Sequence, residues 1–556
     1  MIRSIKLKFG KAPSVPAESI TTTPVTVFVG PNNSGKSKLL LEINQFCSSG
    51  NTNPSDVILD KIEFKPLSAE AAEEKIQKVT LRPNLSEMIP PPNILVGKRS
   101  YRAQVPKQEL INSLIDPNGR SSQFCQWYLT YNTLILDGKN RISLVNQQNA
   151  GDLQQSPQMS FQVLFRDDQK RKEVRRIIYD SFNLYFVVDP TFLGNFRIRL
   201  SKRPPSEDSE ERGLHEAAIK FHSDALLIDQ ASDGTKSFIG IITEVIAGDP
   251  TILLIDEPEA FLHPSLATNL GKEISIAISG SEKRLFVSTH SPNFVMGCIQ
   301  SGAQVTIVRL TYRNNVATAR VLPKEDILRL MRNPLLRSTN VLNGLFYDFV
   351  IVTESDTDRA FYQEINERLL RFKPDFGIPN CLFINAQNKQ TIQTIIKPLR
   401  ELGIPTLGIV DIDILKNGGT EWTSFLESGF VPVLEHQPLG TLRSSIKLKF
   451  ESSGKDMKRD GGIQILSSED RDSANHLFDR LAEYGLFVVR KGELESWLSQ
   501  LGVPGHGSSW LIEIFRKMGD EPESAQYLKP SEEDVWLFLF ELKRWLIDPN
   551  RKGIPV

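Results

Sequence analysis

A glycine-rich segment of the type G-x-x-x-x-G-K-S carries the clearest chemistry in this chain. It spans Gly30–Ser37 and follows Val25–Val29, a run rich in β-branched residues that predicts a strand. Such a loop exposes successive backbone N–H groups, and the helix after it favours negative charge at its N-terminus. Lys36 is expected to reach the β- and γ-phosphates of a nucleotide, and the Ser37 hydroxyl to ligate Mg²⁺. We therefore predict a nucleoside triphosphate site formed by Gly30, Asn33, Ser34, Gly35, Lys36 and Ser37.

Two further apolar runs end in residues that suit hydrolysis of such a nucleotide. Ile252–Ile255 leads into Asp256 and Glu257, so a buried strand would deliver two carboxylates at its C-terminal end. Asp256 can hold the Mg²⁺ shell there, and Glu257 can polarise the attacking water. Arg284–Thr289 predicts another strand, and His290 follows it where a sensor of the γ-phosphate is needed. A polar strand end and an ordinary histidine are the simpler interpretations, and the phosphate loop favours the functional ones.

The segment Ala231–Ser237 predicts the opening of a helix. Ser232 and Gly234 would present a hydroxyl and backbone N–H groups toward an anion at that helix N-terminus. Taken alone, this segment would indicate only a helix cap.

A second pattern begins near residue 344, where strand-like and helix-like segments alternate. This alternation predicts a parallel sheet with a site at the carboxyl ends of its strands. Apolar runs at 349–353, 381–386 and 405–410 predict three of these strands. Four acidic residues follow the first and the third run, namely Glu354, Asp358, Asp411 and Asp413. Carboxylate oxygens of this kind suit Mg²⁺ or Mn²⁺ and not zinc.

Composition limits the alternatives. The 556 residues include 66 lysines and arginines against 67 aspartates and glutamates, so nucleic-acid binding would depend on local patches. The four cysteines are scattered without a C-x-x-C pair, which suits a reducing compartment and argues against structural zinc. The N-terminus lacks the apolar core of a signal peptide, and no run approaches the ~18 apolar residues of a membrane span. We expect a cytoplasmic protein of about two to four domains that has no membrane partner.

The region from about 46 to 213 is harder to interpret. Tyr131–Leu136, Asp137-Gly138 and Arg141–Val145 together predict a β-hairpin around a tight turn. Gln169–Arg176 is a basic run on a predicted helix. Such runs are usually solvated faces, and contact with nucleic acid is the alternative.

The motifs of the first half, in this order, resemble the ATP-binding-cassette branch of P-loop ATPases. Within that branch, Asp256–Glu259 followed by Leu262-His263-Pro264 resembles the ATPase half of the overcoming-lysogenisation-defect (OLD) nucleases. The resemblance implies that ATP and Mg²⁺ are bound, and that two heads sandwich nucleotide. Ser232 and Gly234 of one head would then contact the γ-phosphate held by the other.

The acidic motifs of the second half, E-x-x-x-D and D-x-D, resemble a TOPRIM domain, the metal-dependent fold of topoisomerases, primases and OLD nucleases. Arg490–Glu495 is similar to the last OLD motif, which brings a lysine and an acid to the metal site. The resemblance implies that Glu354 and Asp358 serve one Mg²⁺ or Mn²⁺ position and that Asp411 and Asp413 serve the other. Lys491 would neutralise developing charge, and Glu493 and Glu495 compete for one ligand role.

We therefore expect an α/β protein of two domains. Residues 1–343 would form an ABC-type P-loop ATPase head with an inserted α/β region at about 46–213, available for dimerisation or DNA contact. Residues 344–556 would form a Rossmann-like, parallel-sheet TOPRIM domain with a C-terminal helical extension.

The leading hypothesis is an ATP-dependent, metal-dependent DNA endonuclease of the OLD type, similar to the nucleases of Gabija-type systems. The resemblance implies a homodimer or higher homo-oligomer that acts in anti-phage defence. RNA as substrate stays open, and so does the need for a co-encoded partner such as a helicase or reverse transcriptase. The alternative is an ATP-gated DNA clamp or scaffold whose carboxylates cut nothing. A primase or topoisomerase is disfavoured because the chain shows no zinc-binding module or other partner domain of those enzymes.

Overall fold

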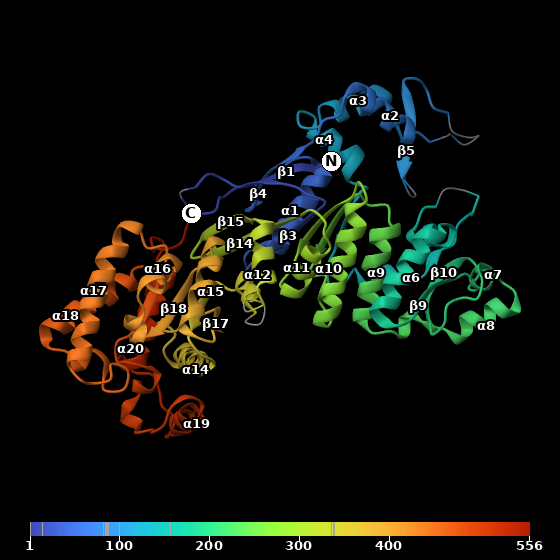
Figure 1. Cartoon of the computed structure of the whole chain (residues 1–556). Helices are drawn as coiled ribbons and strands as arrows, with labels where there is room; N and C mark the ends of the chain where they lie inside the picture. The colour runs from blue at the N-terminus through green and yellow to red at the C-terminus, as the bar shows by residue number, and fades with distance from the viewer. Residues whose placement is uncertain are drawn as a thin grey trace. The chain divides into compact units, whose positions relative to one another are not determined.

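The structure, a computed structural model, describes residues 2–13, 15–81, 83, 88–98, 101–154, 157–334, 336 and 340–555. The chain divides into two compact units, Met1–Lys324 and Glu325–Val556 (Figure 1). The structure thus divides the chain between residues 324 and 325, at the start of α12 (Lys324–Arg332). The sequence predicted the division about 20 residues later, at 343/344, between α12 and the first strand of the second unit.

A six-stranded sheet of order β15-β14-β3-β13-β12-β7 forms the centre of the first unit. Its strands are β3 (Val25–Val29), β7 (Thr133–Leu136), β12 (Ile252–Asp256), β13 (Arg284–Ser288), β14 (Val305–Arg313) and β15 (Val316–Leu322). All neighbours run parallel except the β14–β15 pair. Every residue of β3 is buried, as an apolar strand with a parallel neighbour on each side requires.

A smaller antiparallel sheet, β2-β1-β4, packs with the central sheet around α1 (Lys36–Ser49). It consists of β1 (Ile2–Leu7), β2 (Ser19–Thr21) and β4 (Leu59–Phe64). Ile5 and Ile62 of this sheet share one apolar core with Leu40 of α1 and with Leu254 and Phe286 of the central sheet. β1 and β2 pair antiparallel ahead of the phosphate loop.

Helices surround the central sheet, and α10 lies beside α11 (Figure 1). α9 (Asp233–Ala247) precedes β12, α10 (Pro264–Ser279) follows β12, and α11 (Pro292–Gln300) follows β13. The inserted region extends past its predicted end at about 213 to include α8 and β11. It forms a β5–β6 hairpin and a sheet of order β11-β10-β8, with β9 paired to β10. Its strands are β5 (Asn93–Lys98), β6 (Tyr101–Pro106), β8 (Gln148–Asn149), β9 (Tyr185–Asp189), β10 (Asn195–Ser201) and β11 (Leu226–Leu227). Its helices are α2 (Ala69–Val79), α3 (Lys107–Ile115), α4 (Ser121–Phe124), α5 (Ser160–Arg166), α6 (Asp168–Phe182), α7 (Asp208–Arg212) and α8 (Glu216–Asp224).

The hairpin predicted at 131–145 is wrong. β7 pairs in parallel with β12 as an edge strand of the central sheet, and Ile142–Val145 is a 3₁₀ turn, not a second strand. The Asp137 carboxylate accepts the N–H groups of Lys139 and Asn140, both at 2.8 Å, and this Asx-type turn leads into the 3₁₀ turn. A single sequence shows the strand propensity of β7 but not its partner, which is about 120 residues away in the chain.

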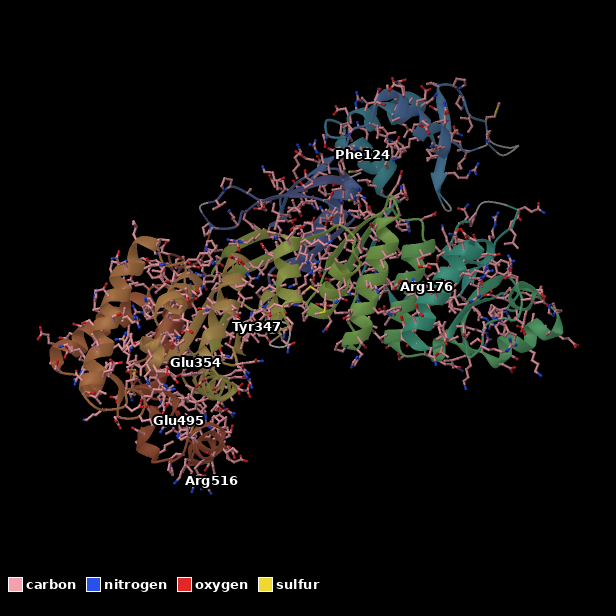
Figure 2. All side chains as sticks on the ribbon, in the orientation of Figure 1. Phe124, Arg176, Tyr347, Glu354, Glu495 and Arg516 are labelled. Atoms are coloured by element: carbon pink, nitrogen blue, oxygen red, sulfur yellow. The ribbon has the colours of Figure 1, made fainter. Side chains whose placement is uncertain are left out.

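The basic run at 169–176 lies on α6, and its arginines are committed to ion pairs. Arg171 is buried, and its Nε lies 3.1 Å from Glu211 Oε2. Arg176, labelled in Figure 2, places Nη2 2.6 Å from Glu273 Oε2 of α10. The arginine charges of this run are therefore balanced by acids of the same unit.

A four-stranded parallel sheet of order β17-β16-β18-β19 forms the centre of the second unit. Its strands are β16 (Phe349–Thr353), β17 (Cys381–Asn385), β18 (Thr406–Asp411) and β19 (Leu486–Val489). The predicted parallel sheet is thus confirmed. Because β16 and β18 are neighbours and run in the same direction, the residues that follow them meet at one edge of the sheet.

Helices fill much of the remainder of the second unit, including most of the stretch at 415–470. They are α14 (Asp356–Phe372), α15 (Lys389–Glu401), α16 (Gly419–Ser428), α17 (Val433–Ser452), α18 (Ser468–Ala482), α19 (Gly507–Met518) and α20 (Asp534–Ile547). The 3₁₀ turns η5 (Ile412–Lys416) and η6 (Gly462–Ile465) flank the helical stretch formed by α16 and α17. Within the described ranges, no helix has the length and apolarity needed to cross a membrane.

Candidate functional sites

The phosphate loop lies between β3 and α1, as its sequence predicts. Asn33 adopts a left-handed backbone with φ of 61°, and α1 begins at Lys36. Lys36 is buried, and its Nζ donates to the carbonyl oxygens of Gly30 at 2.9 Å and Pro31 at 2.8 Å. Burial lowers the pKa of Lys36 to about 8, although the nearby acids oppose this shift. The ammonium therefore lies over the loop whose N–H groups would hold phosphate.

The candidate Mg²⁺ position of the ATPase unit is organised around Asp256. Ser37 Oγ, from the first turn of α1, donates to Asp256 Oδ1 at 2.8 Å. The Ser288 hydroxyl, from the end of β13, donates to the same oxygen. The ends of β3, β12 and β13 thus converge on one carboxylate because these strands are parallel neighbours.

Glu257 and His290 face each other next to this carboxylate. His290 Nε2 lies 3.5 Å from Glu257 Oε1. Burial lowers the pKa of His290 to about 4, and the charge of Lys36 acts in the same direction, so the imidazole is neutral at pH 7. Glu257 has φ of 48°, a backbone conformation that costs free energy in residues other than glycine and clusters at functional sites.

Two residues to which the sequence gave no role of their own, the buried Arg141 and the partly buried Glu259, support this pair. Arg141, in the turn after β7, donates through Nη1 to the carbonyl oxygens of Asp256 at 3.1 Å and Glu257 at 2.5 Å. Glu259 Oε1 accepts the N–H of His290 at 2.8 Å, and burial raises the pKa of Glu259. Glu259 could have been found from its place in the acidic motif. Arg141 could not, because the hairpin prediction placed it on a strand.

Ser232 and Gly234 open α9, where the sequence predicts them. Ser232 is the N-cap residue, its Oγ accepts the N–H of Thr235 at 3.2 Å, and it is exposed. Gly234 is buried, and a Cβ on it would lie 2.4 Å from the carbonyl oxygen of Phe261. Glycine is therefore required there for packing within the chain, while Ser232 is exposed at the helix N-terminus. Contact with a second copy stays a prediction.

Three of the predicted carboxylates come together in the second unit. Glu354, Asp411 and Asp413 each offer an oxygen, and these oxygens lie within 4.8 Å of one another. Glu354 Oε1 also accepts the N–H of Asp411 at 2.9 Å. Burial, reinforced by the neighbouring carboxylates, raises the pKa of Glu354 to about 8 and that of Asp411 to about 7. Such crowding of acids in a partly buried position costs free energy that a bound cation removes.

Asp358 has a different local role. It forms a capping box with Ser355 at the start of α14, and its Oδ2 accepts the N–H of Ser355 at 2.9 Å and the hydroxyl at 2.8 Å. Burial raises its pKa. Glu354 thus joins the aspartates of β18 and η5, while Asp358 binds its own helix terminus outside this three-oxygen group. The Asp358 charge still contributes to the raised pKa values of Glu354 and Asp411.

The last predicted motif divides in two. Glu493 and Glu495 form a second group of potential ligands with His506, whose Nδ1 lies 2.7 Å from Glu495 Oε1. Lys491 points elsewhere, because its ammonium pairs with Asp534 of α20. Glu354 and Glu495 are both labelled in Figure 2.

Lys458, which the sequence did not single out, brings a positive charge to these carboxylates. Its Nζ lies 2.7 Å from Asp411 Oδ2 and 3.5 Å from Glu493 Oε2. A lysine in a loop more than 40 residues after the aspartate motif gives no sequence signal of its own. The donor set of Glu354, Asp411 and Asp413, all carboxylate oxygens, fits Mg²⁺ or Mn²⁺.

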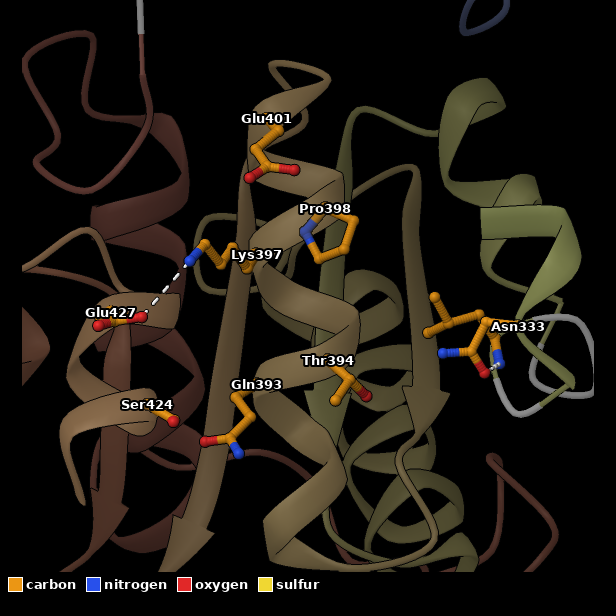
Figure 3. Close-up of a pocket in the computed structure, with 9 residues that line it drawn as sticks. Asn333, Gln393, Thr394, Lys397, Pro398, Glu401, Ser424 and Glu427 are labelled. Atoms are coloured by element: carbon orange, nitrogen blue, oxygen red, sulfur yellow. Dashed lines mark hydrogen bonds and ion pairs between the residues drawn. The ribbon is translucent and has the colours of Figure 1, made fainter. Parts of the chain in front are cut away.

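A separate surface cleft of about 410 Å³ lies between α15 and α16 in the second unit (Figure 3). Lys397 and Glu427 form an ion pair of 3.5 Å across it. Its other labelled residues are mostly uncharged, namely Asn333, Gln393, Thr394, Pro398 and Ser424, with Glu401 at one end. It contains no residue of the carboxylate cluster, so we assign it no part in the chemistry.

Comparisons with known proteins agree with these two sites. Residues 163–296 match the family model described as an AAA domain of a putative AbiEii toxin of a type IV toxin–antitoxin system. Residues 345–413 match the model of the TOPRIM domain of overcoming-lysogenization-defect-like proteins. The chain therefore combines a P-loop ATPase domain with a TOPRIM domain.

One curated relative is the Old nuclease of Escherichia phage P2, which is 26% identical over 263 residues. That match covers 44% of this chain and 43% of the relative, so this chain aligns with less than half of the relative's length. With both domain matches, the chain is thus similar to OLD proteins in its ATPase and TOPRIM domains.

Similar solved structures are heads of SMC proteins. An SMC head bound to the C-terminal winged-helix domain of ScpA is 14% identical with a TM-score of 0.32, and the match covers 59% of this chain and 99% of that chain. The SMC head domain from Thermotoga maritima is 15% identical with a TM-score of 0.29, covering 58% and 99%. With TM-scores this low, we base no functional argument on these matches.

Proposed function

We propose that this protein is an ATP-hydrolysing, metal-dependent endonuclease that cuts DNA. The observation that carries the proposal is the meeting of Glu354, Asp411 and Asp413 at the carboxyl ends of β16 and β18. Supporting it, the TOPRIM match includes all three residues, and the one curated relative cited above is named a nuclease.

In the ATPase unit, each proposed role follows from position. Lys36 binds the β- and γ-phosphates, and Ser37 with Asp256 holds Mg²⁺. Glu257 accepts a proton from the attacking water, while the neutral His290 contacts the γ-phosphate. Arg141 and Glu259 act as positioning residues because they bind the backbone that carries these groups.

In the TOPRIM unit, Glu354, Asp411 and Asp413 would hold one or two Mg²⁺ or Mn²⁺ ions. A bound ion supplies positive charge that stabilises the transition state of phosphodiester hydrolysis. The chain itself orients the ligands: the Asp411 N–H fixes Glu354, and η5 carries Asp413 past the strand end. Asp358, Glu493 and Glu495 stay candidates for a further cation position.

The family resemblance adds the biological setting to the proposal. We propose a homo-oligomer, at least a dimer, in which Ser232 of one copy meets nucleotide bound by another, and a role in defence against phage. The exposed position of Ser232 at the N-terminus of the 15-residue helix α9 supports this arrangement.

Nicking of supercoiled plasmid with Mg²⁺ or Mn²⁺ tests the nuclease proposal, with ATP hydrolysis measured on the same preparations. Asp411→Ala and Glu354→Ala should each lower nicking about a thousandfold, because each removes an anionic ligand of the cation. ATP hydrolysis should stay near the wild-type rate. Parallel reactions with single-stranded DNA and RNA identify the preferred substrate.

Asp356→Ala is the matched control, because Asp356 starts α14 close to the site but pairs with Arg359 at 2.7 Å and is exposed. It should cut like the wild type. If both cluster variants also cut at the wild-type rate, the cutting proposal fails and the DNA clamp or scaffold takes its place.

A further inference from the structure

Lys458 stands in the turn between α17 and η6, with its ammonium among the carboxylates of the TOPRIM unit. Nζ lies 2.7 Å from Asp411 Oδ2 and 3.5 Å from Glu493 Oε2. The side chain is 25% exposed, against 16% for Asp411 and 8% for Glu493. A cation thus occupies part of the coordination sphere that the proposed function gives to a metal ion.

The turn that carries Lys458 is anchored on both sides of this residue. Met457 is buried with 5% of its surface exposed. The Asp456 carboxylate accepts the N–H of Lys458 at 2.8 Å, and the Asp460 carboxylate accepts the N–H of Asp456 at 2.8 Å. Lys458 is therefore presented by a closed turn and is not a surface lysine that reaches in from a long loop.

Two glycines allow this turn to lie against the one that carries Glu493. Gly492 has φ of 120°, and a Cβ on it would lie 2.0 Å from the carbonyl oxygen of Lys458. Gly462 has φ of 59°, and a Cβ on it would lie 2.0 Å from the carbonyl oxygen of Arg490. Both positions combine a left-handed backbone with close backbone contact, so they favour glycine on two counts. The local sequence is thus specialised for this approach.

Lys491 provides a contrast within the same site. Its ammonium pairs with Asp534 and lies 5.2 Å from the centre of the Trp497 ring. Asp534 is fixed in turn, because its Oδ2 accepts the N–H of Leu498 at 2.8 Å. One lysine is committed to the C-terminal helix α20, and the other is committed to the carboxylates.

We propose that Lys458 is a positioning residue that serves as the resident cation of the TOPRIM site. Its ammonium holds Asp411 and Glu493 together before a divalent ion binds, and it competes with that ion for Asp411. The inference rests on the metal site of the proposed function and adds a regulator of that site: Lys458 lowers the affinity for the divalent ion and thereby sets the ion concentration at which the site fills.

Removing this charge should therefore strengthen ion binding. A positive charge next to a ligand oxygen opposes a divalent ion at that oxygen, and side-chain movement relieves part of this repulsion. We expect Lys458→Met to tighten Mn²⁺ binding by about tenfold. A lysine with a merely structural role predicts the opposite sign, because its loss would loosen the ligands.

Titration of the full chain with Mn²⁺, without nucleotide, measures this affinity directly. The fraction of binding that Asp411→Ala abolishes defines the site. Lys458→Met and Lys458→Gln remove the charge with different polarity, and Lys458→Arg should restore an affinity near the wild-type value. Lys455→Met removes a charge from the same turn, and Lys491→Met removes the lysine that pairs with Asp534. Both controls should stay within about twofold of the wild type, because neither ammonium contacts Asp411.

The outcomes separate the two proposals. If the wild type shows no Mn²⁺ binding that depends on Asp411, the metal site fails and the inference falls with it. If the wild type binds but both Lys458→Met and Lys458→Gln weaken binding or leave it unchanged, the inference alone is overturned. The same holds if Lys455→Met tightens binding as much as Lys458→Met does. Tightening confined to the two Lys458 variants supports the inference, whatever the nicking activity.

Discussion

The two candidate sites use the same position in a sheet but surround their central carboxylates with different groups. Both lie at the carboxyl ends of parallel strands, β3, β12 and β13 in one unit and β16 and β18 in the other. In the ATPase unit, the carboxylate of Asp256 accepts neutral hydroxyl donors. In the TOPRIM unit, acids lie beside acids, and the pKa values of Glu354 and Asp411 rise to about 8 and 7, chiefly through burial.

This difference indicates how each site is prepared for its cation. Hydroxyl–carboxylate hydrogen bonds fix the geometry around Asp256 before any ligand arrives, at little electrostatic cost. The TOPRIM cluster instead stores repulsion that a divalent ion would relieve, with Lys458 neutralising part of it. We therefore expect ATP hydrolysis to depend on single side chains such as Glu257. We expect cation binding at the TOPRIM site to depend on pH and on competing cations.

The largest expected effect separates the two chemistries. Glu257→Gln keeps the shape of the side chain but cannot accept a proton, so ATP hydrolysis should fall about a thousandfold while nucleotide binding is retained. Plasmid nicking measured without ATP should not change, because Glu257 belongs to the ATPase unit and not to the carboxylate cluster of the TOPRIM unit. Phosphate release, binding of a fluorescent nucleotide and nicking on one preparation check this. Hydrolysis at the wild-type rate would show that the end of β12 is not the catalytic strand.

The sequence could predict the parts of both sites that depend on local patterns. Each strand that carries a site residue was recognisable as a short apolar run, and the residue directly after it was predicted to be functional, as for Glu257 and Glu354. That Glu354, Asp411 and Asp413 lie at one sheet edge followed from a general property of parallel sheets. The pairing of Glu354 with Asp358 at one metal position did not predict the observed grouping, in which Glu354 joins both aspartates.

The residues that sequence reasoning missed act through long-range contacts. Arg141 binds the backbone of Glu257, which is 116 residues later in the chain, and Lys458 reaches Asp411 from a turn beyond two helices. Nothing in the sequence near these two residues distinguishes them from ordinary surface cations. Lys491 shows the reverse case: its motif is clear, but the position of Asp534 on α20 turns its ammonium away from the cluster.

A smaller effect tests whether nucleotide is shared between copies. Ser232→Asp keeps an N-cap that α9 accepts but places a negative charge toward the γ-phosphate of a partner. ATP binding should be retained, and hydrolysis should fall by about tenfold or more, since like charges repel strongly in a desolvated site. Ser232→Thr, which keeps both the cap and the hydroxyl, should stay near the wild-type rate.

Mixing Ser232→Asp with Lys36→Ala protein sharpens this test. Each variant lacks a different half of a shared site, so one interface of a mixed dimer keeps one intact site and part of the hydrolysis should return. Mixed assemblies, isolated with two different affinity tags, are the sample to assay. No recovery in them would contradict the sandwich arrangement and leave Ser232 as a helix cap alone.

The smallest effect concerns the pH dependence of stability in the TOPRIM unit. Glu354 and Asp411 have folded-state pKa values of about 8 and 7, whereas both groups titrate near pH ~4 in an unfolded chain. Between these values the folded state binds more protons than the unfolded state, so stability falls as the pH rises. In EDTA, the unfolding temperature of this unit should be a few degrees higher at about pH 6 than at about pH 8.5.

Glu354→Gln should remove much of this difference, and the exposed Asp356→Asn should preserve it. Mn²⁺ should reverse the difference by binding the ionised carboxylates. If the unfolding temperature in EDTA instead rises with pH, other charges of the chain already neutralise these acids. The contrast between the two sites would then be wrong.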